Sequence, residues 1–255
     1  ADLMRWLAVV LAVLGAPALA CSPNDAPPYS TMDRVGSGDI RTAAYGDATT
    51  RYAHGILGDA IEAGSLVVGV ADGTCASVTL PRDSVFEDTG PRIVDLDGDG
   101  GNEVVVVETR ADTGAALVVY GLMRGALVKL DATPNIGRSN RWLAPVGIGD
   151  LDGDGRTEIA YVDRPHLAKV LTVWEWRDGG LHPEARMEGV TNHRIGERDI
   201  AGGIRRCAGR APEMIVATSD WSRLLAVQLA GDKLKARDIG PHRGRASFAK
   251  AMACP

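Results

Sequence analysis

Short runs of apolar residues recur along most of the chain, and their length is that of β-strands. β-Branched and aromatic residues are common in these runs, and turn-forming residues separate them, which is typical of strands joined by tight turns. No long segment shows the spacing of an amphipathic helix. The pattern therefore predicts an all-β fold that begins near Ile40. The clearest strand-length runs are Ser65–Val70, Glu103–Thr109, Ala115–Tyr120, Thr157–Val162, Val170–Trp176 and Glu213–Thr218.

An acidic segment occurs twice along the chain, 55 residues apart. Residues 95–103 read Asp-Leu-Asp-Gly-Asp-Gly-Gly-Asn-Glu, and residues 150–158 read Asp-Leu-Asp-Gly-Asp-Gly-Arg-Thr-Glu. A further 55-residue step leads to Arg205 and to a strand-like run at Glu213, without the aspartates. Residues 57–68 fit the same template about 38 residues before the first copy. The chain therefore has four recognisable repeats, of which the outer two are degenerate.

Each repeat has the plan of a propeller blade. It reads as strand, loop, two strands, a Gly-rich turn such as residues 177–180, and a last strand. Four repeats and the material at both ends predict a β-propeller of about five short four-stranded blades over residues 39–255. Because an open propeller leaves unpaired edges, we expect residues 246–253 to close it by pairing with strands near residues 40–45.

The two acidic segments have the composition of calcium loops. Ca²⁺ takes six to eight oxygen ligands, and alternating aspartates in a tight turn direct several carboxylates to one point. Glycine at position 6 permits the bend, position 7 offers its backbone carbonyl, and position 9 returns a Glu. The predicted ligands of two Ca²⁺ ions are Asp95, Asp97, Asp99, the Gly101 carbonyl and Glu103, and Asp150, Asp152, Asp154, the Arg156 carbonyl and Glu158.

An EF-hand begins with the same acidic pattern but differs in two respects. Its Glu stands at position 12, and helices flank the loop. Here the Glu stands at position 9, and the flanks, residues 92–94 and 104–107, are strand-like. Arg205 and Cys207 replace the first two aspartates in the next repeat, so we expect no third calcium there and suggest that Arg205 supplies the missing positive charge.

The two acidic loops and their strand flanks resemble the FG-GAP or VCBS-type repeat family, which forms integrin-like calcium-loop β-propellers. The resemblance extends over about residues 40–255 and is most specific in the two central repeats. The chain is also similar to small exported bacterial proteins with such repeats. The resemblance implies a propeller fold and structural calcium, but it does not imply a reaction.

Charge and composition narrow the choice of partner. The chain has 255 residues, 45% of them hydrophobic, and a formal net charge of −5. This charge argues against nucleic acid, whose binding depends mainly on clustered Lys and Arg. Two Ca²⁺ ions would bring the net charge to −1, so we interpret the acidic balance as unfilled metal sites.

The first 20 residues are predicted to be a signal peptide. Arg5 precedes an apolar run, and Ala18-Leu19-Ala20 suits cleavage after Ala20. The run is too short to span a bilayer, so we expect no transmembrane segment after cleavage and a periplasmic or secreted protein. Anchoring as a lipoprotein through Cys21 is the alternative, although Ala18 stands where such signals usually have Leu. An irregular leader follows at residues 21–38.

Four cysteines in an exported chain predict two disulfides, for which three connectivities exist. We favour Cys21 with Cys75 and Cys207 with Cys254, because each pair would tie one end of the chain to the folded body.

Several polar and aromatic residues fall in loops that blade alignment would bring to one face. Trp142, His166 and His193 are the centre of this predicted protein- or carbohydrate-binding face, where Trp packed between blades is the alternative role for Trp142. No His-x-x-x-His motif or nucleophile elbow accompanies the histidines, so each is also explained as a loop hydrogen-bonding residue.

We therefore expect an exported calcium-binding β-propeller that acts as a binding or scaffold module, with structural calcium and no catalytic residues. The alternative is a polysaccharide- or polymer-active enzyme, a lyase or hydrolase, and a third possibility is a subunit of an envelope complex. Paired carboxylates in a cleft would favour the enzyme. The carboxylates outside the loops to be considered are Glu87, Asp88, Glu184, Glu188, Glu197 and Asp199.

Overall fold

The computed structural model describes residues 21–254, so the predicted signal peptide lies outside the described residues. The fold is all-β, as predicted: within this range the strands form three antiparallel sheets, accompanied by one short helix. The elements are β1 (Asp33–Arg34), β2 (Ile40–Thr49), β3 (Glu62–Val70), β4 (Cys75–Thr79), β5 (Ser84–Phe86), β6 (Arg92–Val94), β7 (Glu103–Arg110), β8 (Gly114–Met123), β9 (Ala126–Ala132), β10 (Leu143–Gly149), β11 (Thr157–Asp163), β12 (Val170–Arg177), β13 (Gly180–Glu188), β14 (Val190–Thr191), β15 (Gly203–Arg205), β16 (Glu213–Thr218), β17 (Arg223–Ala230), β18 (Lys233–Pro241) and α1 (Arg245–Met252). All six strand-length runs predicted from the sequence lie in strands, namely β3, β7, β8, β11, β12 and β16.

The strands follow the sequence repeats. We call β2–β4 the first unit, β6–β9 the second, β10–β13 the third and β15–β18 the fourth. Consecutive strands pair antiparallel within each unit, and the predicted order of strand, loop, two strands, turn and strand holds in the second, third and fourth. Short β5 pairs with both β3 and β7 and thereby joins the first two units into one nine-stranded sheet.

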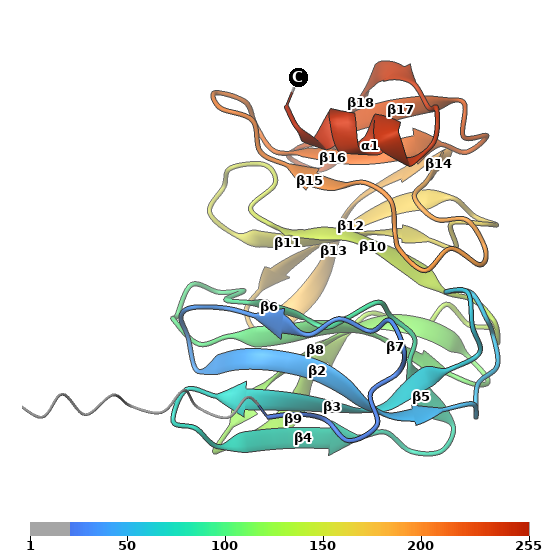
Figure 1. The fold of residues 1–255 in the computed structure, drawn as a ribbon. Coiled ribbons are helices and arrows are strands. Elements are labelled where there is room, and N and C mark those ends of the chain that lie inside the picture. The colour runs from blue at the N-terminus through green and yellow to red at the C-terminus, as the bar shows by residue number, and fades with distance from the viewer. Residues whose placement is uncertain (1–20, 255) are drawn as a thin grey trace, which may run out of the picture.

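The four units are stacked face to face, with an apolar layer between each unit and the next (Figure 1). Successive side chains of β7 point alternately into two of these apolar layers. Val104 and Val106 pack toward the first unit, whereas Val105 and Val107 pack toward the third. Residues on successive positions of a strand point to opposite faces, so a strand buried on both sides is almost continuously apolar. A third layer lies between the third and fourth units.

The prediction that residues 246–253 form a closing strand is wrong, because residues 245–252 form α1. Phe248 and Ala251, three positions apart, lie on one face of this helix and are buried against the apolar face of β16 and β17. Spacing of three is helical, whereas a strand would have exposed one of the two. The helix covers the face of the last sheet that a further blade would have covered. A closed propeller is not seen in residues 21–254, and the predicted count of about five blades is not confirmed.

The first and fourth units meet through loops rather than through paired strands in the described part of the chain. The Gly196 N–H donates to the Ile56 carbonyl at 3.0 Å, and the Arg198 guanidinium lies 3.6 Å from the centre of the Tyr29 ring. Gly58 permits this approach, because a Cβ atom there would lie 2.8 Å from the Gly196 carbonyl oxygen. The contact brings the loops of distant repeats to one side of the stack.

Two disulfides fasten the ends of the described chain, as predicted. Cys21 is bonded to Cys75, and Cys207 is bonded to Cys254, with Cα atoms 5.9 and 5.6 Å apart. Among residues 21–254, none of the helical structure is long and apolar enough to cross a bilayer.

Candidate calcium loops and a loop-lined cavity

The first acidic loop connects β6 to β7 and is organised around Asp95. The two carboxylate oxygens of Asp95 accept the N–H groups of Gly98 and Gly100 at 2.8 and 3.0 Å. Both glycines have positive φ angles, 75° and 90°, which favour glycine over other residues. Oxygens of Asp95, Asp97 and Asp99 come within 4.8 Å of one another. The tight turn thus directs three carboxylates to one point.

The second acidic loop connects β10 to β11 with the same hydrogen bonds. Asp150 accepts the N–H groups of Gly153 and Gly155 at 2.6 and 3.2 Å. The carboxylate at position 9 also has the same role in both loops: Glu103 accepts the Leu96 N–H at 2.9 Å, and Glu158 accepts the Leu151 N–H at 2.6 Å. The sequence repeat is therefore a repeat of backbone geometry.

The structure brings most of the predicted ligands together, in slightly different sets. In the second loop the oxygens that lie within 4.8 Å of one another belong to Asp150, Asp152 and Glu158. Glu103 and Asp154 belong to the same loops but lie outside these two groups. The Gly101 and Arg156 N–H groups donate to Asp99 and Asp154 at 2.6 and 2.8 Å, which holds the residues of the two predicted carbonyl ligands in the turns.

The Glu at position 9 has a raised pKa in both loops. Burial, followed by the charges of the neighbouring carboxylates, raises the pKa of Glu103 to about 7 and that of Glu158 to about 8. Glu158 is 1% exposed. Clustered carboxylates repel one another, a bound cation would relieve this repulsion, and an all-oxygen donor set suits a hard cation such as Ca²⁺.

Glu184 on β13 is an acidic neighbour of the second loop that the motif did not identify as a ligand. Its position falls at a bulge, between Pro183 paired with Trp174 and Ala185 paired with Val173. Its Oε2 atom is buried and has no hydrogen-bond partner in the part of the chain that the structure describes. Burial, followed by the charge of Asp152, raises the pKa of Glu184 to about 7. A buried carboxylate oxygen without a partner fits a site that accepts a metal ion.

In the fourth unit, an arginine stands opposite the equivalent Glu. Arg205 and Glu213 are both buried and form an ion pair at 2.6 Å. Arg205 also donates to the Ala251 carbonyl at 2.6 Å, and Arg237 pairs with the other oxygen of Glu213 at 2.8 Å. Glu213, which corresponds to Glu103 and Glu158 of the acidic loops, is thus paired with guanidinium groups in the fourth unit.

A cavity of about 290 Å³ opens on the side of the stack where the loops converge. It lies near the predicted ligand face, since Trp142 and His166 line it and the His193 ring packs against both, with ring centres 4.9 and 5.2 Å away. Trp142 is 2% exposed, so it is a packing residue in the cavity wall. The lining residues are His54, Ile56, Asn140, Arg141, Trp142, Arg164, His166, Leu167 and Ile195.

Two of the histidines form a chain of hydrogen bonds behind this cavity. His193 Nε2 lies 2.7 Å from the Glu197 carbonyl oxygen, and His193 Nδ1 lies 3.2 Å from His166 Nε2. Burial lowers the pKa of both rings, that of His166 to about 4 with a further contribution from His193. Both rings are then neutral at pH 7, so His193 donates to Glu197 and accepts from His166. His166 retains an unprotonated Nδ1 atom as an acceptor.

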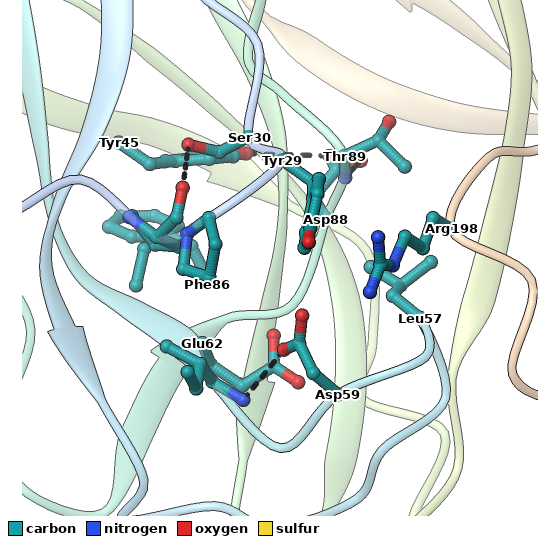
Figure 2. Close-up of a pocket in the computed structure, with 14 residues that line it drawn as sticks. Tyr29, Ser30, Tyr45, Leu57, Asp59, Glu62, Phe86, Asp88, Thr89 and Arg198 are labelled. Atoms are coloured by element: carbon teal, nitrogen blue, oxygen red, sulfur yellow. Dashed lines mark hydrogen bonds between the residues drawn. The ribbon is translucent and has the colours of Figure 1, made fainter.

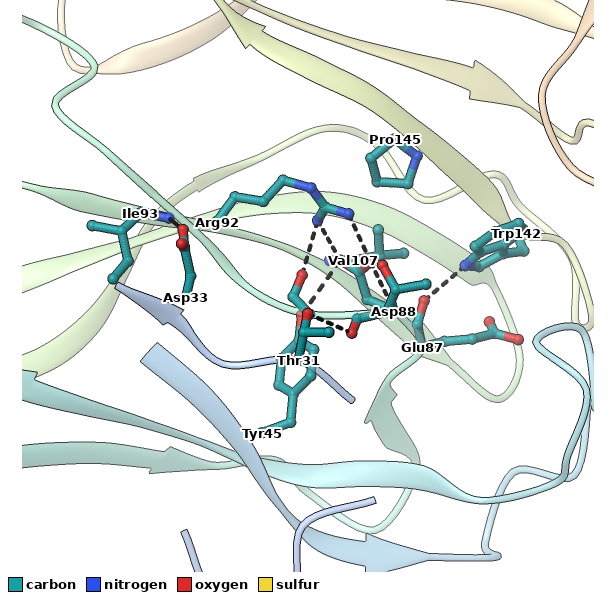
Figure 3. Close-up of polar contacts among 12 residues, drawn as sticks. Thr31, Asp33, Tyr45, Glu87, Asp88, Arg92, Ile93, Val107, Trp142 and Pro145 are labelled. Atoms are coloured by element: carbon teal, nitrogen blue, oxygen red, sulfur yellow. Dashed lines mark hydrogen bonds and ion pairs between the residues drawn. The ribbon is translucent and has the colours of Figure 1, made fainter. Parts of the chain in front are cut away.

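The third histidine of the cavity, His54, is held by a buried carboxylate and not by another histidine. Its Nδ1 atom lies 2.6 Å from Oε1 of Glu87, a fully buried carboxylate whose Oε2 accepts the Thr109 hydroxyl at 2.8 Å. Burial raises the pKa of Glu87, against the opposing effect of these two hydrogen bonds. The Trp142 indole N–H donates to the Glu87 carbonyl at 2.7 Å (Figure 3). This network fixes the wall of the cavity and the orientation of His54.

Three of the six carboxylates considered for catalysis are held by neighbouring side chains. Glu87 lies beneath His54, and Asp88 is held by Arg92 through two contacts of 2.7 and 3.0 Å (Figure 3). Asp199 is paired with Arg245.

A smaller acidic cavity lies beside Asp88 and is lined by Asp59 and Glu62 (Figure 2). Glu62 is 4% exposed. Burial, followed by the charges of Glu87 and Asp59, raises its pKa to about 9, so its carboxyl group is protonated at pH 7.

Comparison with known families supports the resemblance of the acidic loops to FG-GAP-like repeats. Residues 95–161 match the model of the FG-GAP-like repeat, a range that contains both loops and the strands between them. The chain matches none of the curated proteins with which it was compared. The predicted resemblance is therefore confirmed over this range, which runs from the first acidic loop to β11 of the third unit.

Proposed function

We propose that the chain is an exported β-propeller-type module whose two acidic loops bind structural Ca²⁺ and whose loop-lined cavity binds a partner. The observation that carries the proposal is the identical hydrogen bonding of the two acidic loops, each with clustered carboxylates. Asp95, Asp97 and Asp99 would hold one ion, and Asp150, Asp152 and Glu158 the other. Calcium supplies the positive charge that each cluster lacks.

Two further observations support the export and binding parts of the proposal. Disulfides persist in oxidising compartments, and both disulfides join distant parts of the chain. The cavity has cationic Arg141 and Arg164 and the exposed apolar side chains Leu167 and Ile195 at its walls. Apolar side chains beside guanidinium groups suit a peptide better than a sugar.

Calcium removal tests the proposal. A ligand that binds only the folded state stabilises it by about 2.7 kcal/mol at 100 times its dissociation constant. For a protein of this size that stabilisation corresponds to a rise in Tm of roughly 5–10 °C per site. Thermal unfolding should therefore occur at a lower temperature in EDTA than in calcium, and calcium should restore the higher value.

A matched pair of variants makes the test specific. The double variant Asp97→Asn/Asp152→Asn should lose most of the calcium dependence of Tm. Asp178→Asn, in an exposed turn where a positive φ of 52° suits Asn, removes one carboxylate outside the loops and should retain it. A Tm that EDTA leaves unchanged in the unsubstituted chain would refute the calcium part of the proposal.

A further inference from the structure

Positive charge is concentrated at the C-terminal end of the chain. Residues 205–255 contain ten Lys and Arg against four Asp and Glu, a net charge of +6, whereas residues 1–204 contain 18 against 29, a net charge of −11. The overall charge of −5 conceals this separation. A basic region within an acidic protein indicates a local anion-binding surface.

Much of this charge surrounds a cleft of about 630 Å³ between the end of β18 and α1. Five cationic side chains line it, against one acidic side chain, Asp238. Apolar side chains of Leu224 and Ile239 form part of its surface. The cationic lining residues are Arg205, Arg210, Arg237, Arg243 and Lys250.

Internal ion pairs neutralise only part of this charge. Arg205 and Arg237 share the single carboxylate of Glu213. Asp238 is held by Arg223 through contacts of 2.7 and 2.8 Å. Arg210, Arg243 and Lys250 form no ion pair among the residues that the structure describes. The cleft therefore retains about four uncompensated positive charges.

The walls of the cleft are fixed before any ligand binds. Cys254, just after α1, is bonded to Cys207. Arg205, buried beneath the cleft, donates to the carbonyl of Ala251 in α1, and Phe248 packs the helix onto β16 and β17. A preformed site loses less entropy when it binds a ligand than a flexible surface does.

We propose that this cleft binds a soluble molecule that carries phosphate groups. A doubly charged phosphate uses the excess charge better than a single carboxylate does, and guanidinium groups match its oxygen geometry. Single-stranded nucleic acid would require aromatic side chains for base stacking, and none of the aromatic residues among 21–254 lines the cleft. None of the exposed large apolar residues of the described chain lines it either, which argues against docking to a lipid surface. The site does not depend on the proposed calcium loops or on the cavity at Trp142.

Calorimetric titration with a hexose bisphosphate tests this inference, and the unphosphorylated hexose serves as the ligand control. The bisphosphate should bind, the hexose should not, and added salt should weaken the binding. The double variant Arg243→Gln/Lys250→Gln removes two unpaired charges from the cleft and should weaken binding by about tenfold or more, because charge-assisted hydrogen bonds to the phosphate groups are lost.

Lys233→Gln/Lys235→Gln is the matched control. It removes the same charge from exposed positions of β18 outside the cleft, and it should weaken binding less than about twofold. Equal weakening by the two pairs would show a general charge effect and overturn the proposal, as would absence of bisphosphate binding. Tighter binding to phosphatidylglycerol vesicles or to a single-stranded oligonucleotide, lost in Arg243→Gln/Lys250→Gln, would replace it with a membrane or nucleic-acid site.

Discussion

Glu62 is a buried carboxyl group whose titration opposes folding at neutral pH. Its folded pKa of about 9 lies above the ordinary pKa of a glutamate, 4.5, so the native state binds the proton more tightly than the unfolded state does. Stability therefore decreases as pH rises from about 4.5 to about 9. The acidic surroundings of Glu62, including Asp59 and Glu87, add to the effect of burial.

Glu62→Gln should remove this pH dependence while keeping the size of the side chain. We expect the free energy of unfolding, measured with urea, to fall less between pH 5 and pH 9 in the variant, with a difference of roughly 2–3 kcal/mol developing by pH 7. Glu188→Gln, at an exposed position, is the control and should follow the unsubstituted chain. Parallel curves for Glu62→Gln and the unsubstituted chain would contradict the prediction.

His166 should show the opposite dependence at lower pH. Its folded pKa of about 4 lies below the ordinary pKa of a histidine, 6.5, so the unfolded state takes up the proton first as pH falls. Its contribution to stability is therefore lost between about pH 6.5 and pH 4. In an NMR titration, the His166 ring should remain neutral at pH 5 in the folded protein and titrate near pH 6.5 in urea. A folded His166 that titrates near pH 6.5 would contradict the prediction and show that the ring is not buried beside His193 as the structure has it.

Equivalent glutamates in consecutive units have different counter-charges. Glu158 of the third unit lies among carboxylates, whereas Glu213 of the fourth contacts Arg205 and Arg237. Burial raises the pKa of Glu213, but hydrogen bonds and charge interactions with the two guanidinium groups outweigh this effect and lower it. The same strand position is therefore expected to depend on metal in one unit and on an ion pair in the next.

This difference predicts opposite responses to a Glu→Gln substitution. Glu158→Gln should lower Tm in calcium, because a ligand is lost. It should raise Tm in EDTA, because burial, followed by the charges of Glu184 and Asp152, makes the metal-free carboxyl group unfavourable in the folded state. Glu213→Gln should lower Tm equally in both conditions, because it leaves Arg205 buried with a weakened partner. Thermal unfolding of both variants with and without EDTA makes the comparison. A calcium-dependent loss in Glu213→Gln would mean that the fourth unit also binds metal.

Patterns within short stretches of sequence correctly predicted the strands and turns that form from residues close together in the chain. Alternation and β-branched runs located β7 and β11. The Asp-x-Asp-x-Asp-Gly spacing located the acidic loops, because the carboxylates at positions 1 and 9 of each loop accept hydrogen bonds from residues at most seven positions away. The disulfide pairing was also confirmed, on the argument that each bond fastens one end of the chain.

Features that depend on contacts between segments far apart in the chain could not be predicted from local sequence patterns. Glu184 approaches the second loop from β13, 26 residues after Glu158, and only the β-bulge pairing reveals its position. Residues 246–253 have small apolar residues that suit a strand or a helix, and the open face of β16 and β17 decides between them. The convergence of Trp142, His166 and His193 was expected, but the burial of Trp142 was not determined by its sequence context.

At the scale of the whole molecule, a stack of sheets leaves one apolar face uncovered at each end unless another element covers it. At the C-terminal end that element is α1, whose Phe248 is 5% exposed and packs with Ile215, Ala217, Leu224 and Ala226. The Cys207–Cys254 bond and the contact of Arg205 with Ala251 hold the helix in place. The helix therefore replaces the neighbouring blade that a closed ring would supply.

Phe248→Ala tests whether this cover contributes to the stability of the whole molecule. Truncating a buried Phe typically costs about 3–5 kcal/mol, and loss of the helix would expose an apolar sheet face that promotes association. We expect the free energy of unfolding in urea to fall by about that amount, and sedimentation to show concentration-dependent self-association. Phe248→Leu, which keeps most of the apolar volume, should cost less than about 1.5 kcal/mol and remain monodisperse. If Phe248→Ala were as stable as Phe248→Leu, the last sheet would not need the helix, and its face would instead be available to a further blade.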